Sequence, residues 1–106
     1  MTAKELIESL PQRFKPDMAE GINALFHFDI SGTNGGQYTV SVKDKTCTVQ
    51  QGLQGDASCV VKASDEDYTE IIEGRQNAMT AFMFGKIKVS NLSELMRLKD
   101  AFQFKI

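Results

Sequence analysis

The sequence contains no tryptophan, only two cysteines and a single histidine among its 106 residues. Cys47, Cys59 and His27 are too few to complete the four-ligand site of a structural zinc ion, so we expect no metal. The first residues do not show the basic segment and apolar run of a secretory signal. We therefore expect a cytoplasmic protein whose two cysteines are reduced thiols rather than a disulfide.

The sequence also lacks an excess of positive charge and a long hydrophobic run. Its 12 basic and 14 acidic residues give a formal net charge of −2, so we expect no nucleic-acid partner. The charge is unevenly spread, because residues 1–84 hold seven basic and twelve acidic groups (net −5) and residues 85–106 hold five and two (net +3). The most apolar stretch, residues 78–84, is far shorter than the roughly 20 residues of a membrane-spanning helix.

Catalytic motifs are absent as well. The sequence has no G-x-S-x-G nucleophile elbow. It has no phosphate-binding loop either, because Gly85-Lys86 lacks the upstream glycine and the following Ser or Thr. His27 stands between two phenylalanines in an alternating pattern, which favours a structural or exposed role. We therefore expect a protein that is not an enzyme and that uses no cofactor.

Acidic residues cluster at 65–73, where a calcium loop is the alternative to a solvated helix face. A calcium loop beginning at Asp65 would need glycine at its sixth position, where this sequence has Glu70. The cluster is therefore interpreted as the charged first turns and outer face of a helix.

The order of helical and strand patterns predicts an α+β fold. Thr2 and Glu5 have the spacing of a capping box before a helix that we expect Pro11 to end. Alternating apolar and polar residues, separated by short turn-rich loops, then predict an antiparallel meander. The period changes to that of a helix at Ser64. In chain order, the predicted elements are a helix at 2–10, a short helical turn at 15–21, strands at 26–30, 38–42, 47–49 and 57–63, helices at 65–73 and 78–84, a strand at 87–89 and a helix at 92–102.

The helix predicted at 78–84 is apolar on nearly every side, since Thr80 is its only polar residue. In a soluble protein such a helix has to be buried all round. Either both faces lie in a solid core, or one packs on the sheet while the other lines a cavity, and composition alone does not decide. Methionine adapts to ligands of variable shape, which favours keeping the second interpretation. The apolar residues concentrated in the last third of the chain are Met79, Phe82, Met83, Phe84, Met96 and Phe102.

The segment that contains this helix, TAFMFGKIKVSNLSELMRL, resembles the signature of the sterol carrier protein domain, also called the nonspecific lipid-transfer protein domain. That signature has a small residue and a phenylalanine, then Gly-Lys-(Leu/Ile)-Lys-(Ile/Val), a turn, and a helix rich in leucine and methionine. Upstream, GINALFHFDISG, GGQYTVSV and ASCVVKASDEDYTEIIEG resemble strands of the family and the helix after them, and LPQRFKPDMAEG resembles the lead-in of bacterial members. The resemblance therefore runs through nearly the whole chain in order.

The resemblance implies one domain over residues 1–106. Its fold would be a five-stranded mixed, mainly antiparallel sheet in the order 3-2-1-4-5, with helices over one face enclosing an apolar tunnel. The helix at 78–84 would form a wall of that tunnel, so that its second apolar face meets lipid. The family positions and the apolar residues of the last third together give the expected lining: Phe26, Phe28, Val40, Ile71, Ile72, Met79, Phe82, Met83, Phe84, Leu95, Met96 and Phe102.

Two positions depart from the family pattern. Phe84 stands where animal members often have glutamine, so a polar contact inside the tunnel is missing. The turn before the last helix, Ser90-Asn91, is one residue shorter than usual and lacks the common glycine. Asn91 tolerates the left-handed conformation, which lets such a turn form.

The resemblance implies noncatalytic binding and transfer of a hydrophobic lipid, such as a fatty acid, a fatty acyl-CoA, a sterol-like molecule or a phospholipid. The alternative is an accessory subunit that presents a lipid or a quinone-type intermediate to partner enzymes. A hydrolase working from His27 or a cysteine, and an interaction module with a solid core, are further rivals. The expected partners are the lipid and either a transient membrane surface or a lipid-metabolising enzyme. Residues 92–106 are expected to form a mobile, membrane-facing cover.

Overall fold

A five-stranded mixed sheet organises the chain in this computed structural model, which describes residues 1–102. Its strand order, β3-β2-β1-β4-β5, confirms the predicted order. Neighbouring strands run antiparallel except for β1 and β4, which are parallel. The strands are β1 (Ala24–Ser31), β2 (Gly36–Lys43), β3 (Thr46–Gln51), β4 (Cys59–Ser64) and β5 (Ile87–Val89).

The hairpin between β2 and β3 closes with a two-residue turn. Asp44 and Lys45 both adopt positive φ values, 52° and 60°, and Lys43 pairs with Thr46 on either side. Two consecutive left-handed residues are the geometry of a type I′ turn, whose twist matches that of the flanking strands. The turn therefore fixes the register of the predicted meander.

The connection from β3 to β4 crosses the outer face of the sheet. The Thr39 hydroxyl donates to the Gly52 carbonyl at 2.8 Å and accepts from the Gln54 amide at 2.9 Å. His27 Nε2 lies 2.8 Å from the Gln54 carbonyl oxygen. These bonds hold the crossing loop, which brings β4 beside β1 in parallel, and they give the lone histidine a structural contact.

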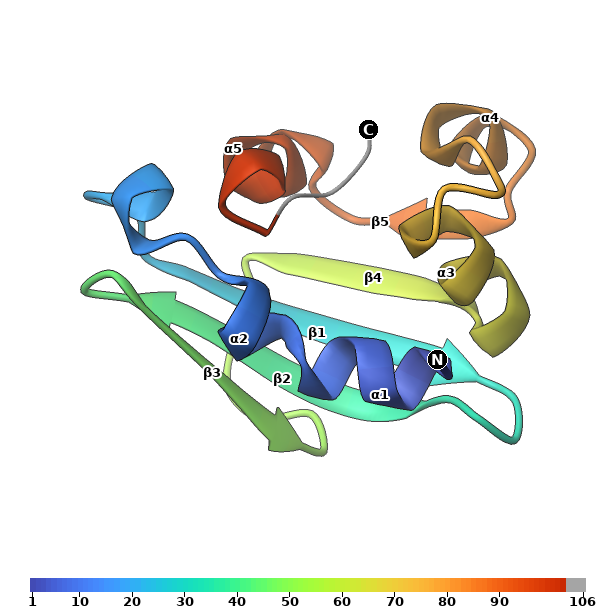
Figure 1. Cartoon of the computed structure of the whole chain (residues 1–106), viewed down its shortest axis with the longest axis horizontal. Coiled ribbons are helices and arrows are strands. Elements are labelled where there is room, and N and C mark those ends of the chain that lie inside the picture. Colours follow the sequence, from blue (N-terminus) through green and yellow to red (C-terminus); the bar gives the residue numbers. More distant parts are fainter. Residues whose placement is uncertain (103–106) are drawn as a thin grey trace.

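Helices cover the other face of the sheet (Figure 1). The helices α1 and α2 and the 3₁₀ helix η1 come from the N-terminal segment, and α3, α4 and α5 lie over the end of the sheet that contains β4 and β5. Their bounds are α1 (Ala3–Glu8), α2 (Leu10–Arg13), η1 (Pro16–Ala19), α3 (Asp65–Ile72), α4 (Ala78–Met83) and α5 (Leu92–Phe102).

Side chains at the start of two helices cap the free amides of the first turn. The capping box between Thr2 and Glu5 is formed, and the Asn77 side chain accepts a hydrogen bond from the Thr80 amide at 3.0 Å. The expectation that Pro11 ends the first helix is wrong, because α1 stops at Glu8 and Pro11 lies in the first turn of α2. Proline is tolerated there, since the amides of a first turn have no intrahelical partner.

The end of α5 is firmly docked. Phe102 is buried, its ring centroid lies 5.4 Å from that of Phe14, and the Ala101 carbonyl accepts from the Lys15 amide at 2.8 Å. At its start, the Asn91 side chain accepts from the Glu94 amide, and Asn91 is not among the left-handed residues. Asn91 therefore serves the turn as a helix cap. The part of the proposed cover at residues 103–106 lies outside the described residues.

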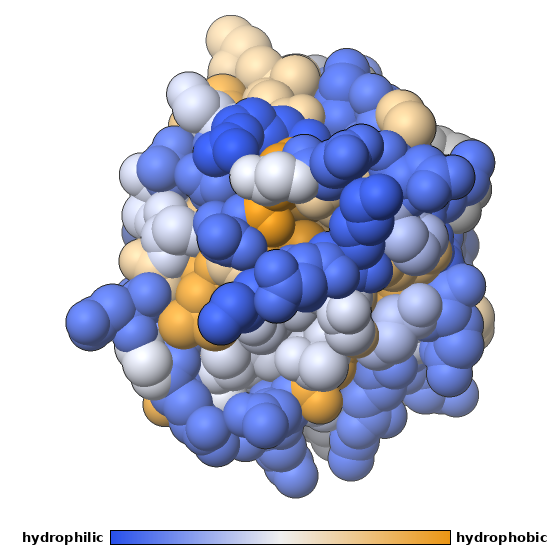
Figure 2. All heavy atoms as spheres, turned by 90° about the vertical axis from the view of Figure 1, so that its left-hand side faces the viewer, coloured by the Kyte–Doolittle hydropathy of each residue, from blue (hydrophilic) through white to orange (hydrophobic). Residues whose placement is uncertain are grey.

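The surface is mixed rather than uniformly polar. On the side that Figure 2 shows, hydrophobic residues form only small areas separated by hydrophilic ones. Within residues 1–102, no helix combines the length and the hydrophobicity that crossing a membrane requires.

Candidate functional site

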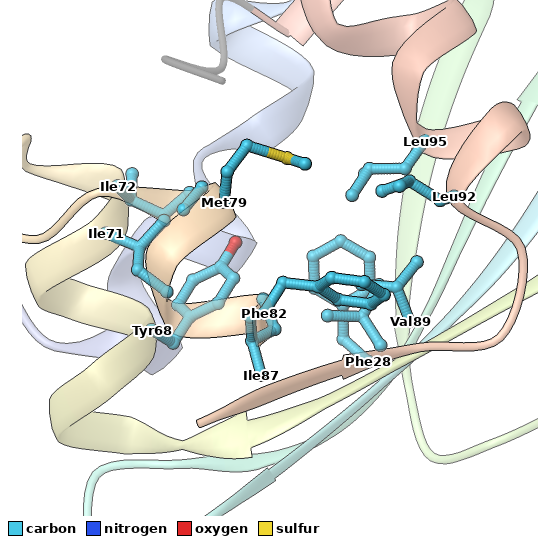
Figure 3. A pocket seen from close by; sticks show the side chains of 12 residues that line it. Phe28, Tyr68, Ile71, Ile72, Met79, Phe82, Ile87, Val89, Leu92 and Leu95 are labelled. Atoms are coloured by element: carbon cyan, nitrogen blue, oxygen red, sulfur yellow. The ribbon is translucent and has the colours of Figure 1, made fainter. Parts of the chain in front are cut away.

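An apolar pocket lies where α3, α4 and α5 meet the sheet (Figure 3). Each of these helices and each of the strands β1, β4 and β5 contributes at least one side chain to its wall. Among the described residues that line it, Tyr68 is the only one whose side chain carries a polar atom other than sulfur. The lining residues are Phe28, Val61, Tyr68, Ile71, Ile72, Ala78, Met79, Phe82, Ile87, Val89, Leu92 and Leu95.

Three neighbouring strands form the floor of the pocket. Phe28 on β1 pairs in register with Val61 on β4, which in turn pairs with Val89 on β5. Because side chains in register on adjacent strands point to the same face, these three stand side by side beneath the helices. Strand alternation also turns Ile87 to this face and the intervening Lys88 away from it.

Helical spacing builds the walls. Tyr68, Ile71 and Ile72 lie three and four residues apart on α3 and therefore share one face. The Ser64 side chain starts this helix by accepting from the Asp67 amide at 3.1 Å.

The two remaining helices face each other across the pocket. Ala78 and Phe82 lie one turn apart on α4, and Leu92 and Leu95 project from α5. In Figure 3, Met79 extends across the pocket toward Leu95. A movement of α4 relative to α5 would therefore change the size of the pocket.

The pocket is small as it stands. The space inside that can hold the centre of a water-sized atom is about 40 Å³. That is room for roughly three waters at most, and a pocket with apolar walls stays dry. Sites that bury a whole drug-sized ligand measure about 300 Å³ or more. A lipid can enter only if the walls move apart.

Tyr68 is the polar exception in this wall. Its side chain is 3% exposed, and its hydroxyl has no hydrogen-bond partner among the described residues. Its ring meets that of Phe28 edge-on, with centroids 5.9 Å apart. Burial raises the pKa of Tyr68 well above its ordinary value, and the positive charge of Arg13 opposes this only in part. The hydroxyl is therefore a neutral donor.

The structure brings together six of the twelve expected lining residues, namely Phe28, Ile71, Ile72, Met79, Phe82 and Leu95. Three others, Phe26, Val40 and Phe102, are buried in the solid core away from the pocket. Met83 and Phe84 are 80% and 78% exposed, and Met96 is 37% exposed. None of these last six lines the pocket as it stands.

The expectation that the helix at 78–84 is buried all round is wrong. Only Ala78 and Ala81 of α4 are buried, Phe82 is half-buried, and Met79 is 42% exposed. The reason is position: α4 packs on β5, the last strand of the sheet, and much of the rest of the helix is exposed. The apolar pattern identified the helix but not how far the sheet extends beneath it.

Six lining residues were not expected, although most had a signal in the sequence. Val61, Ile87 and Val89 belong to apolar strand faces, and Tyr68 and Leu92 belong to helical stripes. Ala78 had no such signal, because an alanine gives the same sequence pattern whether it lies in a solid core or in a cavity wall.

The other reactive groups lie outside the pocket. Cys47 and Cys59 are buried free thiols, and burial raises the pKa of both, that of Cys47 to about 12. A thiol with a raised pKa is a poor nucleophile at neutral pH. The described part of the chain contains no cluster of His, Cys, Asp and Glu that could hold a metal ion.

Comparisons with known proteins agree on one family. The sequence profile of the SCP-2 sterol transfer family matches residues 3–103. The chain is 30% identical over 98 residues to sterol carrier protein 2 from Gallus gallus, covering 89% of this chain and 18% of that protein. It is 26% identical over 98 residues to hydroxysteroid dehydrogenase-like protein 2 from Bos taurus, covering 91% of this chain and 23% of that protein. The chain thus spans less than a quarter of the length of these curated relatives.

A solved structure matches over nearly its full length. Palmitated SCP2L2 from Aedes aegypti superposes with a TM-score of 0.73 at 22% sequence identity, covering 96% of this chain and 95% of that one. This likeness supports the α+β fold with its mixed sheet.

Proposed function

This chain belongs to the SCP-2 sterol transfer family, and we propose that it binds a lipid without catalysis in the pocket between α3, α4, α5 and the sheet. The observation that carries the proposal is the pocket wall, in which eleven of the twelve residues have no hydrogen-bonding side chain. No nucleophile and general base face each other in that wall, which favours a carrier over a hydrolase.

The energy of binding would come from burial of apolar surface. Each methylene moved from water into the pocket contributes about 0.8 kcal/mol, so a long acyl chain offers on the order of 10 kcal/mol before ordering costs. An apolar wall does not distinguish strongly between chains of similar volume. A fatty acid, a fatty acyl-CoA, a sterol-like molecule and a phospholipid therefore all remain candidates.

Entry of the ligand requires the pocket to widen, and α4 is the wall best suited to move. It is six residues long, and much of its surface is exposed. The opposite wall, α5, is anchored at its end by the Phe14–Phe102 contact. A short element with few buried contacts opens at a lower free-energy cost than a docked one. The flexible side chain of Met79 can then repack around ligands of different shape.

We further propose that α4 and the turn after it meet a membrane surface during exchange. Met83 and Phe84 expose large apolar side chains at the end of α4, and Met79 lies one turn before Met83. Residues three or four apart share a helix face. Met79, Met83 and the neighbouring Phe84 therefore form an apolar strip that runs from the pocket wall to the surface. A lipid leaving the pocket along the strip would stay in contact with apolar side chains.

The charges around this strip favour an anionic surface as the partner. Between Glu73 and Glu94 the sequence has no acidic residue, but it has Arg75, Lys86 and Lys88, all exposed. Lys86 and Lys88 have no ion-pair partner within residues 1–102. Each lysine near an anionic bilayer contributes about 1 kcal/mol of attraction. Presentation of a lipid or quinone-type intermediate to an enzyme would use the same pocket and stays a prediction.

Binding can be tested by filling the pocket. Ala78→Phe places a ring in the wall of the pocket, whereas Ala57→Phe places one in the crossing loop on the outer face of the sheet. Native mass spectrometry of each protein mixed with palmitate, and titration with a fluorescent fatty acid, would compare them. We expect binding to the parent and to Ala57→Phe, and a loss of at least tenfold in Ala78→Phe. Equal binding by all three proteins would contradict the proposed site.

A further inference from the structure

We propose that the Tyr68 hydroxyl is the polar anchor of the pocket, donating a hydrogen bond to an uncharged oxygen of the bound lipid. The preferred ligand is then a largely apolar molecule with a hydroxyl, carbonyl or ether oxygen that reaches the pocket interior. This inference rests on the proposed lipid-binding function and adds to it the chemical class of the ligand.

The first reason is that a buried donor lacks an acceptor. The Tyr68 hydroxyl is buried and unpaired within the described residues, and it is the only buried side-chain nitrogen or oxygen there in that state. Buried polar groups in folded proteins are nearly always hydrogen-bonded, because a buried donor or acceptor without a partner costs free energy of folding. A phenylalanine would fill the same space without that cost, so the unpaired hydroxyl indicates an acceptor outside the described residues, which we assign to the ligand.

The second reason is direction. Figure 3 shows the hydroxyl pointing away from α3, toward the space between Met79 and Phe82. A water molecule is a poor permanent acceptor there, because a buried water needs two to four polar partners. The side chains of this wall offer only one. An oxygen that belongs to a ligand needs only that single donor, since the rest of the ligand meets apolar side chains.

The third reason concerns charge. Among residues 1–102, no basic side chain lines the pocket, and Arg13, whose charge acts on the hydroxyl, is not part of the wall. A carboxylate placed at Tyr68 would lose most of its hydration in exchange for one hydrogen bond, which is unfavourable. An alcohol, a ketone or an ester gives up far less hydration. The pocket interior is therefore suited to a neutral oxygen, and a charged headgroup would stay at the surface.

The test compares the parent with Tyr68→Phe, using diphenylhexatriene, a fluorescent hydrocarbon with no oxygen, as the reporter. Both proteins should bind the reporter with affinities within about twofold, because its burial needs no hydrogen bond. Displacement by 1-dodecanol or 2-dodecanone should be about three- to tenfold less effective with Tyr68→Phe, the range expected for one neutral hydrogen bond. Dodecanoate should displace the reporter about equally from both proteins.

The outcomes separate this inference from the proposed function. If neither protein binds the reporter, the lipid pocket and the anchor both fail. If both bind it and the alcohol displaces it equally well, only the anchor fails. If Tyr68→Phe weakens dodecanoate more than dodecanol, the assignment of an uncharged oxygen is overturned.

The stability of the ligand-free protein is a second test. It distinguishes a hydroxyl that awaits a ligand from one that already stabilises the fold. Tyr38 is a matched control, since it is also buried and its hydroxyl interacts with Glu8. In urea unfolding without ligand, Tyr38→Phe should lower the midpoint, whereas Tyr68→Phe should leave it unchanged or raise it. A clear loss in Tyr68→Phe would mean that the hydroxyl already has a partner in the folded chain, and this would overturn the proposal.

Discussion

Met79 and Met83 lie one helical turn apart on α4, but Met79 contributes to the wall of the pocket while Met83 is 80% exposed. The two side chains share a helix face, so the apolar lining of the pocket continues onto the surface of the molecule. Met83 and Phe84 together place two large exposed apolar side chains at the end of this short helix. Larger exposed apolar areas are typical of binding surfaces.

The exposed end of α4 should therefore matter for membranes and not for stability. Replacing Met83 and Phe84 together by serine should change the free energy of unfolding by no more than about 0.5 kcal/mol per site, because both are exposed. The same double variant should bind anionic vesicles more weakly in a sedimentation assay. Met18→Ser and Leu53→Ser, which alter exposed apolar residues elsewhere, are the controls and should bind like the parent.

The lysines after α4 should add a salt-dependent part to vesicle binding. Lys86→Gln should weaken binding to anionic vesicles about fivefold at low ionic strength, the equivalent of about 1 kcal/mol. At high salt the difference should shrink, since exposed charges are screened. Lys43→Gln, in the hairpin between β2 and β3, is a control of the same charge change. An equal effect of both substitutions would show that only net charge matters.

Alanine substitutions at two phenylalanines of the expected lining should distinguish a position in the core from a position in the pocket wall. Phe26 is buried in the solid core, so Phe26→Ala should cost about 3–5 kcal/mol of unfolding free energy. Phe82 is half-buried beside a cavity and has fewer packing partners, so Phe82→Ala should cost less. Lipid affinity should respond in the reverse order. Urea unfolding and titration with a fluorescent fatty acid measure the two quantities, and a larger stability loss at Phe82 would indicate a solid core.

Alkaline pH should destabilise the fold through the buried thiol of Cys47. Burial raises the pKa of Cys47 to about 12, whereas the unfolded chain ionises near the ordinary value of about 8.5. The neutral thiol therefore contributes stability that is fully present below about pH 8.5 and is lost as the pH rises toward 12. Urea unfolding between pH 7 and pH 10 should show this decline, and Cys47→Ala should show a shallower one. Parallel declines in both proteins would assign the effect to other groups.

Much of this architecture could be predicted from local sequence patterns. Strand alternation and helix caps such as Thr2 act between near neighbours, so most elements, and with the family resemblance the strand order, were predicted correctly. The separation of α1 from α2 was not. The pocket depends on long-range geometry. Met83 and Phe84 were expected in the lining because their pattern is apolar, but no local signal says that α4 sits at the edge of the sheet. The unpaired state of the Tyr68 hydroxyl likewise depends on what the fold places around it.

Photo-crosslinking with a diazirine-labelled lipid tests the central claim, that lipid occupies the pocket between α3, α4, α5 and the sheet, most directly. The label should be carried by a long-chain alcohol, with unlabelled alcohol as competitor and mass spectrometry of the peptides to locate the adducts. We expect saturable, competable adducts on residues of the wall, with Phe82, Leu95 and Tyr68 among them, and their loss in Ala78→Phe. Competable adducts confined to the outer face of the sheet, or no competable adduct at all, would contradict the account.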